Sequence, residues 1–243
     1  MTANSAQADY GIDAPRVVAT LFLLGALFVV GSFRSSITIG PVTFLLGRGL
    51  LVSAAVILLE ATLMVVYSKY GKFRYRDRML QRVNWRGDES VLDVGTGRGL
   101  MMIGAAKKLT TGKAVGIDIW SHKDLSGNSM QATLYNAEIE GVRDRVDVQD
   151  GDATALKFPD RSFDVVFSNL CLHNIPGRDA RDRACREIVR VLKPGGKAII
   201  SDFIRTGRYA EVFKLAGTDV ERTGMNFLLS FPPLRVVEVR KAA

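Results

Sequence analysis

Three glycines and one aspartate form the first group of residues whose types and spacing could do chemistry. In the stretch ESVLDVGTGRG, Gly95, Gly97 and Gly99 occupy alternate positions, and Asp93 stands two residues before the first of them. Such a turn lets the backbone approach a bound cofactor closely. A dinucleotide fingerprint has its third glycine three residues after the second, whereas here the interval is two. A carboxylate at this place repels a diphosphate and suits a cation. The loop therefore favours S-adenosylmethionine (SAM), which carries a sulfonium and an α-amino group, over NAD.

Carboxylates at the ends of the next two expected strands extend this site. Asp118 is the third residue of GIDIW, where it can accept hydrogen bonds from both ribose hydroxyls, and Asp152 in DGDAT is placed to receive the adenine amino group. Either aspartate could instead be a turn or capping residue. Trp120 either covers the adenine or is a packing aromatic. The expected cofactor-binding set is Asp93, Gly95, Thr96, Gly97, Gly99, Asp118, Ile119, Trp120, Asp152, Ala153 and Asn169.

The segment SNLCLHNIPG supplies candidates for catalysis. Methyl transfer is an in-line displacement, so much of its rate comes from alignment, and a base is needed only when the nucleophile must lose a proton. His173 is the candidate base because its ordinary pKa lies near neutrality, with a substrate-lining or structural role as the alternative. Asn169 is the second catalytic candidate. With two histidines and two distant cysteines in the chain, we expect no metal site and reduced thiols.

Alternating strands and helices from residue 87 onward would position these side chains. Strands are expected at 90–94, 113–119, 145–152, 162–170, 197–203, 219–223 and 235–240. Helices are expected at 99–110, 129–141, 178–193 and 207–217. This order, with apolar strands, predicts a parallel sheet covered by helices on both faces. Ligands of such sheets bind beyond the carboxyl ends of the strands, where the candidate residues fall.

The same region resembles the class I SAM-dependent methyltransferases. The resemblance lies in VLDVGTGRG, in GDATALKFPDRSFDVVFSNLCLHNI and in REIVRVLKPGGKAII; it covers residues 87–203 and is closest to the small-molecule and quinone or sterol branch. It implies an α/β, doubly wound, Rossmann-like fold with seven strands, the last antiparallel. It also implies an enzyme that transfers a methyl group from SAM and releases S-adenosylhomocysteine. The NPPY-type tetrad of nucleic-acid and amide N-methylating relatives is absent from the sequence.

Two apolar segments precede this domain. Residues 17–33 carry no charge, and residues 49–67 are interrupted only by Glu60. Both approach the roughly 20 residues that a helix needs to cross a bilayer. We therefore expect two transmembrane helices joined by a loop that contains Arg34, the Gly40–Pro41 turn and Arg48. A re-entrant hairpin, a signal peptide and buried helices of a soluble protein are the alternatives.

The basic character of the chain is local. Of the formal charge of +8, the segment 69–86 contributes seven Lys or Arg residues against Asp77. The positive-inside rule then places this segment, the catalytic domain and the N-terminus on the cytoplasmic side, with the segment against anionic headgroups. The expected division is a membrane anchor at 1–68, a basic linker at 69–86 and a methyltransferase domain at 87–243.

The expected function is a membrane-anchored methyltransferase that acts on a small or lipid-like acceptor, without nucleic acid as a partner. A SAM-binding scaffold without catalysis and an RNA or protein methyltransferase remain the alternatives. The accepting atom and the oligomeric state do not follow from the sequence.

Overall fold

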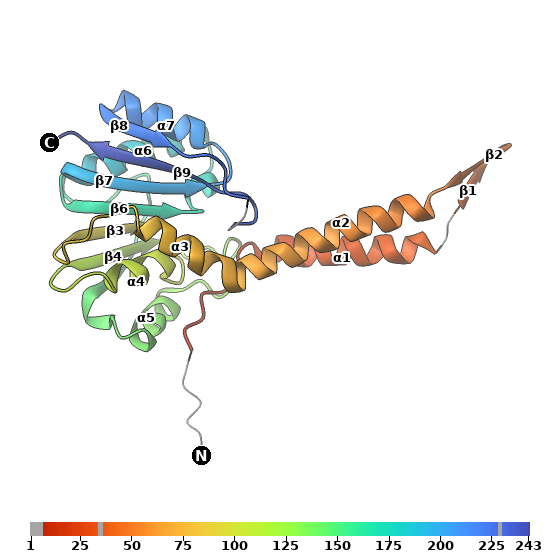
Figure 1. Ribbon diagram of the computed structural model, residues 1–243, viewed down its shortest axis with the longest axis horizontal. Coiled ribbons are helices and arrows are strands. Elements are labelled where there is room, and N and C mark those ends of the chain that lie inside the picture. Colours follow the sequence, from red (N-terminus) through yellow and green to blue (C-terminus); the bar gives the residue numbers. More distant parts are fainter. Residues whose placement is uncertain (1–6, 34–35, 228–229) are drawn as a thin grey trace, which may run out of the picture.

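The computed structural model describes residues 7–33, 36–227 and 230–243. It consists of an α/β body and a long helical hairpin that projects from one end of that body (Figure 1). Arg34, which we expected in the loop between the apolar helices, lies outside the described residues.

The body is built on one seven-stranded sheet in the order β5-β4-β3-β6-β7-β9-β8. Its strands are β3 Ser90–Val94, β4 Lys113–Asp118, β5 Val146–Asp150, β6 Phe163–Asn169, β7 Leu192–Asp202, β8 Thr218–Arg222 and β9 Arg235–Lys241. The first five run parallel, and β9 is antiparallel to both β7 and β8. The expected Rossmann-like sheet with an antiparallel last strand is confirmed.

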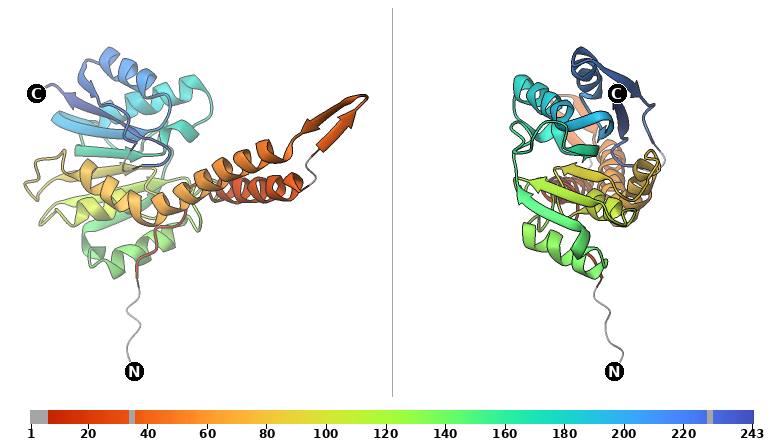
Figure 2. Two further views of the ribbon diagram at one scale, coloured as in Figure 1. Left: turned by 45° about the vertical axis from the view of Figure 1, so that its right-hand side comes forward. Right: turned by 90° about the vertical axis from the view of Figure 1, so that its left-hand side faces the viewer.

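Apolar side chains on both faces of the strands explain why helices cover both faces of the sheet (Figure 2). Val91 packs into one core with α3 and α4, whereas its neighbour Leu92 packs into a second core with α6 and α7. This alternation follows from the two-residue period of a strand. The helices of the body are α3 Lys72–Leu80, α4 Leu100–Ala106, α5 Met130–Ile139, α6 Arg178–Val191 and α7 Thr206–Leu215. Short 3-10 turns lie at Arg143–Arg145 and Leu172–Asn174.

The hairpin consists of α1 Pro15–Ser32, the strands β1 Ser36–Ile39 and β2 Val42–Leu45, and α2 Gly47–Val66. Its buried residues recur every seven positions: Val18, Gly25 and Ser32 on α1, and Gly47, Ala54 and Ala61 on α2. Small residues let the two backbones approach closely, and a seven-residue period favours a left-handed pair. By length and composition both helices could cross a membrane. The two short strands at the tip were not predicted.

The second hairpin helix does not end at the body. It continues through a π-helical turn, η1 Tyr67–Gly71, into α3. We expected a linker over 69–86, but Tyr75, Met79 and Leu80 of this segment are buried in the core of the body. The basic residues are interspersed with apolar ones, so the segment has both a charged face and a packing face.

The residues before α1 also belong to the body. Asn136 on α5 accepts a hydrogen bond from the amide of Asp9 (3.0 Å) and donates to the carbonyl of Asp9 (2.8 Å). The ammonium group of Lys72 is buried and donates to the carbonyls of Tyr10 and Gly11, both at 2.7 Å. We expected a membrane anchor over residues 1–68, but the projecting part of the chain begins at Pro15.

Candidate active site

Asp93 at the end of β3 is the best buried of the candidate residues. Its Oδ2 accepts hydrogen bonds from the Thr96 hydroxyl (2.8 Å) and from the Met102 amide (2.9 Å), so the carboxylate holds the glycine loop against the start of α4. Burial raises the pKa of Asp93 to about 7, and the nearby Asp118 adds to that shift while the two hydrogen bonds oppose it. A cation at this loop would stabilise the charged form.

The glycines of the loop are required by its geometry. Gly95 has a φ of +76°, and a Cβ placed there would lie 2.3 Å from the Sγ of Cys171. Gly97 has a φ of +54°, and its Cβ would lie 2.9 Å from the side chain of Leu125. The loop thus packs between the segment that follows β6 and the segment that follows β4. Sequence reasoning anticipated the close approach to a cofactor but not these protein contacts.

Asp118 joins the end of β4 to the glycine loop. Its Oδ2 accepts from the Gly97 amide (2.8 Å), and its Oδ1 accepts from the Trp120 amide (2.7 Å) and from the Asn128 side chain (3.2 Å). A carboxylate has about four lone-pair positions, so Asp118 retains capacity for a hydroxyl donor. Asn128, which the sequence analysis missed, is buried, and its Oδ1 has no hydrogen-bond partner among the described residues.

The remaining cofactor candidates lie at the same edge of the sheet with different roles. The indole N–H of Trp120 donates to Asp150 at the end of β5. Asp152 is exposed, and its side chain accepts a hydrogen bond from the Thr154 amide at 2.8 Å, which is a turn contact. Ile119 is exposed and Ala153 is buried. The contact with Thr154 is the one expected if Asp152 is a turn residue, the alternative to its binding the adenine.

His173 has an acidic partner that the sequence analysis did not name. Its Nδ1 lies 2.9 Å from Oδ1 of Asp202, a fully buried carboxylate at the end of β7, but the two groups are not aligned as a hydrogen bond, and Nδ1 has no hydrogen-bond partner among the described residues. The His173 amide and the Phe203 amide donate to Asp202, at 3.1 and 2.9 Å. A hydrogen bond from Nδ1 to this carboxylate would orient the imidazole and leave Nε2 to exchange a proton with a substrate. The only signal for Asp202 in the sequence was its place at a strand end.

Asn169, the other catalytic candidate, ends β6 opposite Ser201 of β7. Its Oδ1 is buried without a hydrogen-bond partner among the described residues. Together with Asn128 it presents two unpaired oxygen acceptors at the carboxyl edge of the sheet. Two such acceptors, with Asp93 and Asp118 nearby, fit the ammonium and hydroxyl donors of SAM.

Burial keeps the two thiols in their neutral form. Burial raises the pKa of Cys171 and also that of Cys185, the latter to about 12. Both cysteines are free, so they are neutral thiols near physiological pH.

A hollow of about 440 Å³ lies beside the strand ends and not among them. It runs between α3 and residues 223–227, and its lining combines apolar residues with Arg78, Arg82 and the polar Thr223 and Asn226. A more polar hollow of about 300 Å³ lies at the opposite edge of the sheet, lined by residues that include Glu89, Asp164 and Lys197. Neither lining includes the glycine loop.

Comparison with known proteins identifies the region that contains this edge. Residues 92–200 match the family described as "Methyltransferase domain". Methyltransferase GfsG of Streptomyces halstedii is 31% identical over 139 residues, which cover 57% of this chain and 46% of that protein. The 27-O-demethylrifamycin SV methyltransferase of Amycolatopsis mediterranei is 33% identical over 54% of this chain and 44% of its own. A demethylmenaquinone methyltransferase of Symbiobacterium thermophilum is 30% identical over 55% and 53%.

The chain spans about half the length of these curated relatives. Solved structures support the fold. The [4+2]-cyclase SpnF superposes with a TM-score of 0.60 at 20% identity, over 70% of this chain and 82% of its own. A SAM-dependent methyltransferase from Aquifex aeolicus superposes with a TM-score of 0.53 at 19% identity, over 68% and 88%.

Proposed function

We propose that the protein is a class I SAM-dependent methyltransferase, anchored to a membrane, that methylates a small, apolar or lipid-like acceptor; the match of residues 92–200 to a methyltransferase domain and the methyltransferases of similar sequence support this proposal. The observation that carries the proposal is the position of the glycine loop with Asp93 and Asp118. These residues lie at the carboxyl edge of the sheet, and this edge faces the hairpin (Figure 1).

Bound SAM would supply an electrophilic methyl group. The protein's own contribution is to hold and align the cofactor. Asp93 fixes the glycine loop, and Asp118 joins that loop to β4. The unpaired side-chain oxygens of Asn128 and Asn169 would accept hydrogen bonds from SAM. His173, with Asp202 beside its Nδ1, would take a proton from an acceptor hydroxyl at Nε2 during transfer. These assignments belong to the proposal.

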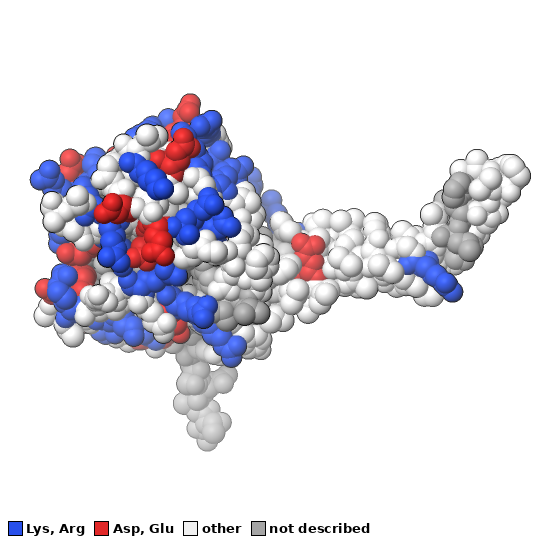
Figure 3. All heavy atoms as spheres, turned by 45° about the horizontal axis from the view of Figure 1, so that its top comes forward, with Lys and Arg blue, Asp and Glu red and all other residues white. Residues whose placement is uncertain are grey.

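The hairpin supports a membrane location because most of its outer surface is apolar. Leu23 on α1 is 61% exposed and Val52 on α2 is 66% exposed, and the face of the hairpin seen in Figure 3 is mostly uncharged, with a few acidic and basic side chains, in contrast to the densely charged body. Soluble proteins rarely leave so continuous an apolar surface in water. Low burial also argues against core helices of a soluble protein. Glu60 lies six residues before the end of α2, about 9 Å by helix rise, within reach of the headgroup region.

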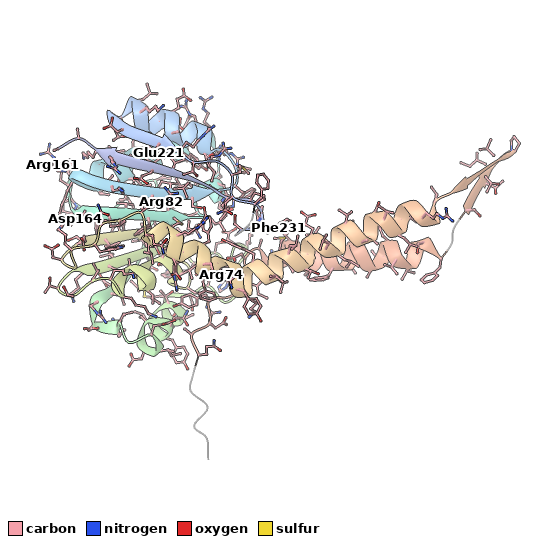
Figure 4. The ribbon with its side chains drawn as sticks, viewed as in Figure 1. Arg74, Arg82, Arg161, Asp164, Glu221 and Phe231 are labelled. Atoms are coloured by element: carbon pink, nitrogen blue, oxygen red, sulfur yellow. The ribbon has the colours of Figure 1, made fainter. Side chains whose placement is uncertain are left out.

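The basic segment supports a cytoplasmic body, but through fewer residues than we expected. Lys72 is buried, Arg82 pairs with Glu238 and Arg86 pairs with Asp88. The exposed positions without an ion pair among the described residues are Lys69, Arg74 and Arg78. Arg74 lies at the end of α3 nearest the hairpin (Figure 4). These three side chains are proposed to meet anionic headgroups.

The class of acceptor is proposed from the location and from the relatives. Two relatives named demethylmenaquinone methyltransferases and one from Caenorhabditis elegans named a sterol 4-C-methyltransferase carry names of apolar substrates. An anchored site can receive such molecules directly from the bilayer.

The test uses full-length protein in lipid nanodiscs with methyl-labelled SAM, offered either the lipid extract or the aqueous metabolites of its source cells. We expect a labelled lipid product. We also expect His173→Gln to lower the rate by about 10²–10⁴-fold with unchanged SAM affinity, the range for loss of a general base. Label only in aqueous products would contradict the lipid-like acceptor, and an unchanged rate in His173→Gln would remove the base.

A second candidate function follows from one comparison. SpnF, which shares this fold, is named a [4+2]-cyclase, so the fold alone does not fix methyl transfer as the reaction. Tight SAM binding without label in lipid, metabolite, RNA or protein fractions would favour a non-transferring role.

A further inference from the structure

Tyr67 is a buried polar residue that the proposed mechanism does not use. It is 4% exposed, and its hydroxyl has no hydrogen-bond partner within the described part of the chain. A buried hydroxyl without a partner lowers stability relative to phenylalanine at the same place. The side chain is therefore costly to the protein alone and calls for a ligand that satisfies it.

The backbone at Tyr67 is also unusual. The residue opens the π-helical turn η1 in a helix that is otherwise regular from Gly47 to Leu80. Single π turns are rare and occur often at functional sites, because the extra residue rotates every side chain that follows relative to those before it. This observation is independent of the unpaired hydroxyl.

The position of Tyr67 follows from Tyr75, eight residues further along the same helix. The Tyr75 hydroxyl lies 2.8 Å from that of Ser201, near the carboxyl end of β7. The helix runs antiparallel to β7, with its hairpin end beyond the strand ends (Figure 1). Eight residues correspond to about 12 Å of helix. Tyr67 therefore lies beyond the carboxyl ends of the strands, the region where ligands of this fold class bind.

The residue next to Tyr67 connects it to the cofactor side of the site. The Ser68 hydroxyl donates to Oδ2 of Asp13 (3.0 Å), and Asp13 forms a β-bridge with Leu125. The side chain of Leu125 is the one that packs over Gly97 of the glycine loop. Tyr67 thus stands between the glycine-loop side and the β7 side of the strand-end region.

The surroundings of Tyr67 define what its hydroxyl can bind. It belongs to the apolar core that also includes Tyr75 and Phe167, and Leu170 and Phe203, which flank the strand ends of β6 and β7, pack against this core. Burial, and after it the nearby Asp13 carboxylate and Tyr75, raise the pKa of Tyr67, so its hydroxyl stays a neutral donor in a largely apolar core. Such a donor suits a molecule with an apolar body and an oxygen that can accept a hydrogen bond, such as a phenolic, carbonyl or ether oxygen.

We propose that Tyr67 binds the methylated substrate: its hydroxyl donates a hydrogen bond to an oxygen of an apolar substrate that enters from the bilayer beside the hairpin. This hydrogen bond turns the substrate toward the methyl group of SAM. This inference rests on the proposed function and names the residue that selects the acceptor.

The test compares Tyr67→Phe with Tyr75→Phe in full-length protein in nanodiscs. The probe is the lipid extract of the source cells with methyl-labelled SAM. Tyr67→Phe should keep or raise the melting temperature, leave the SAM dissociation constant unchanged, and lower formation of labelled lipid by about tenfold, mainly through a higher half-saturating extract concentration. Tyr75→Phe, which loses a hydrogen bond to Ser201, should instead lower the melting temperature.

Each alternative outcome overturns the inference in a distinguishable way. Wild-type product kinetics in Tyr67→Phe would show that the hydroxyl does not touch the acceptor. A parallel loss of SAM affinity would assign Tyr67 to the cofactor loop. A lower melting temperature would make its role structural. SAM binding without labelled lipid in the wild type would refute the proposed function, and this inference with it.

Discussion

At the scale of single residues, Asp93 links the charge of the site to pH. Its pKa is raised from 3.8 to about 7, first by burial. A raised acid pKa means that the folded protein binds a proton more tightly than the unfolded chain. The stability that Asp93 contributes is therefore complete below pH about 4 and is lost as the pH rises through about 7. A cation beside the glycine loop offsets that loss by stabilising the carboxylate.

We predict that SAM affinity rises with pH between about 5.5 and 7 and is level above that range. Binding a cation next to protonated Asp93 releases a proton, which gives at most a tenfold gain per pH unit. Asp93→Asn keeps an oxygen for Thr96 and Met102 and cannot titrate, so its affinity should not follow this slope. Calorimetry in two buffers of different ionisation enthalpy counts the protons. Equal slopes in both proteins would exclude Asp93 as their source.

The site residues that could be predicted from the sequence were those in a short motif next to a recognisable strand. The glycines, Asp93 and Asp118 stand in or just after strands with a recognisable pattern, and the structure brings them together. Asp202 and Tyr67 belong to no such motif. Asp202 matters because a histidine 29 positions earlier is folded onto it, and Tyr67 because a helix that the sequence pattern ends there continues into the body.

At the scale of elements, the glycine loop depends on contacts from a distant segment. We predict that Gly95→Ala destabilises the protein by more than Gly141→Ala. Both positions have positive φ, +76° and +68°, which costs an alanine roughly 1–2 kcal/mol. Only Gly95 faces a neighbour, the Cys171 side chain; Gly141 has open space. Chemical denaturation measures both. Equal losses would mean that the Cys171 segment moves freely, and SAM affinity should fall only in Gly95→Ala.

The hairpin is held together by its small residues. We predict that Ala61→Leu, at a fully buried position, separates α1 from α2 and lowers stability by about 1–3 kcal/mol through overpacking. Val56→Leu, at a position 59% exposed on the same helix, should leave stability within about 0.5 kcal/mol.

Thermal unfolding of full-length protein in nanodiscs, followed by helical circular dichroism, compares these two hairpin variants. Equal effects of the two substitutions would contradict the seven-residue packing described for the hairpin.

Elements of the body were predicted to within a few residues because strands and helices alternate with clear apolar periods. Three features were not. The β1–β2 strands lie in a short segment whose pattern read as a loop, and residues 7–14 dock through Asn136, which is 127 positions from Asp9. We predicted a linker for the basic segment because charged residues are interspersed with the apolar positions of α3. Lys72 can be buried because the N-terminal segment supplies carbonyl acceptors for its ammonium group.

At the scale of the whole molecule, the docked N-terminal segment constrains the membrane topology. Residues just before α1 and just after α2 meet where Asp13 bonds Ser68. Both ends of the hairpin therefore lie on the same side of any membrane that it enters. A two-span or re-entrant hairpin satisfies this condition, and a single crossing does not.

We predict that a cysteine at Ile39, in the tip of the hairpin, reacts with a membrane-impermeant maleimide applied to intact cells, whereas one at Lys108, on the body, reacts only after lysis. Both positions are exposed; of the native cysteines, Cys185 is buried and Cys171 is half-buried with a raised thiol pKa, so the parent protein is labelled in parallel as the control. Labelling of neither cysteine before lysis would favour the re-entrant form. Labelling of Lys108→Cys in intact cells would reverse the proposed sidedness.

The docking of residues 7–14 also sets an order of events in time. The ribosome completes both hairpin helices before it makes Asn136. At roughly 5–20 residues per second, synthesis of the 127 residues from Asp9 to Asn136 takes about 6–25 s. Throughout that interval Asp9 lacks its hydrogen-bond partner on α5. In the proposed membrane-anchored form, the hairpin helices are therefore made and available for insertion before the N-terminal segment can close over the edge of the glycine loop, because that closure needs Asn136.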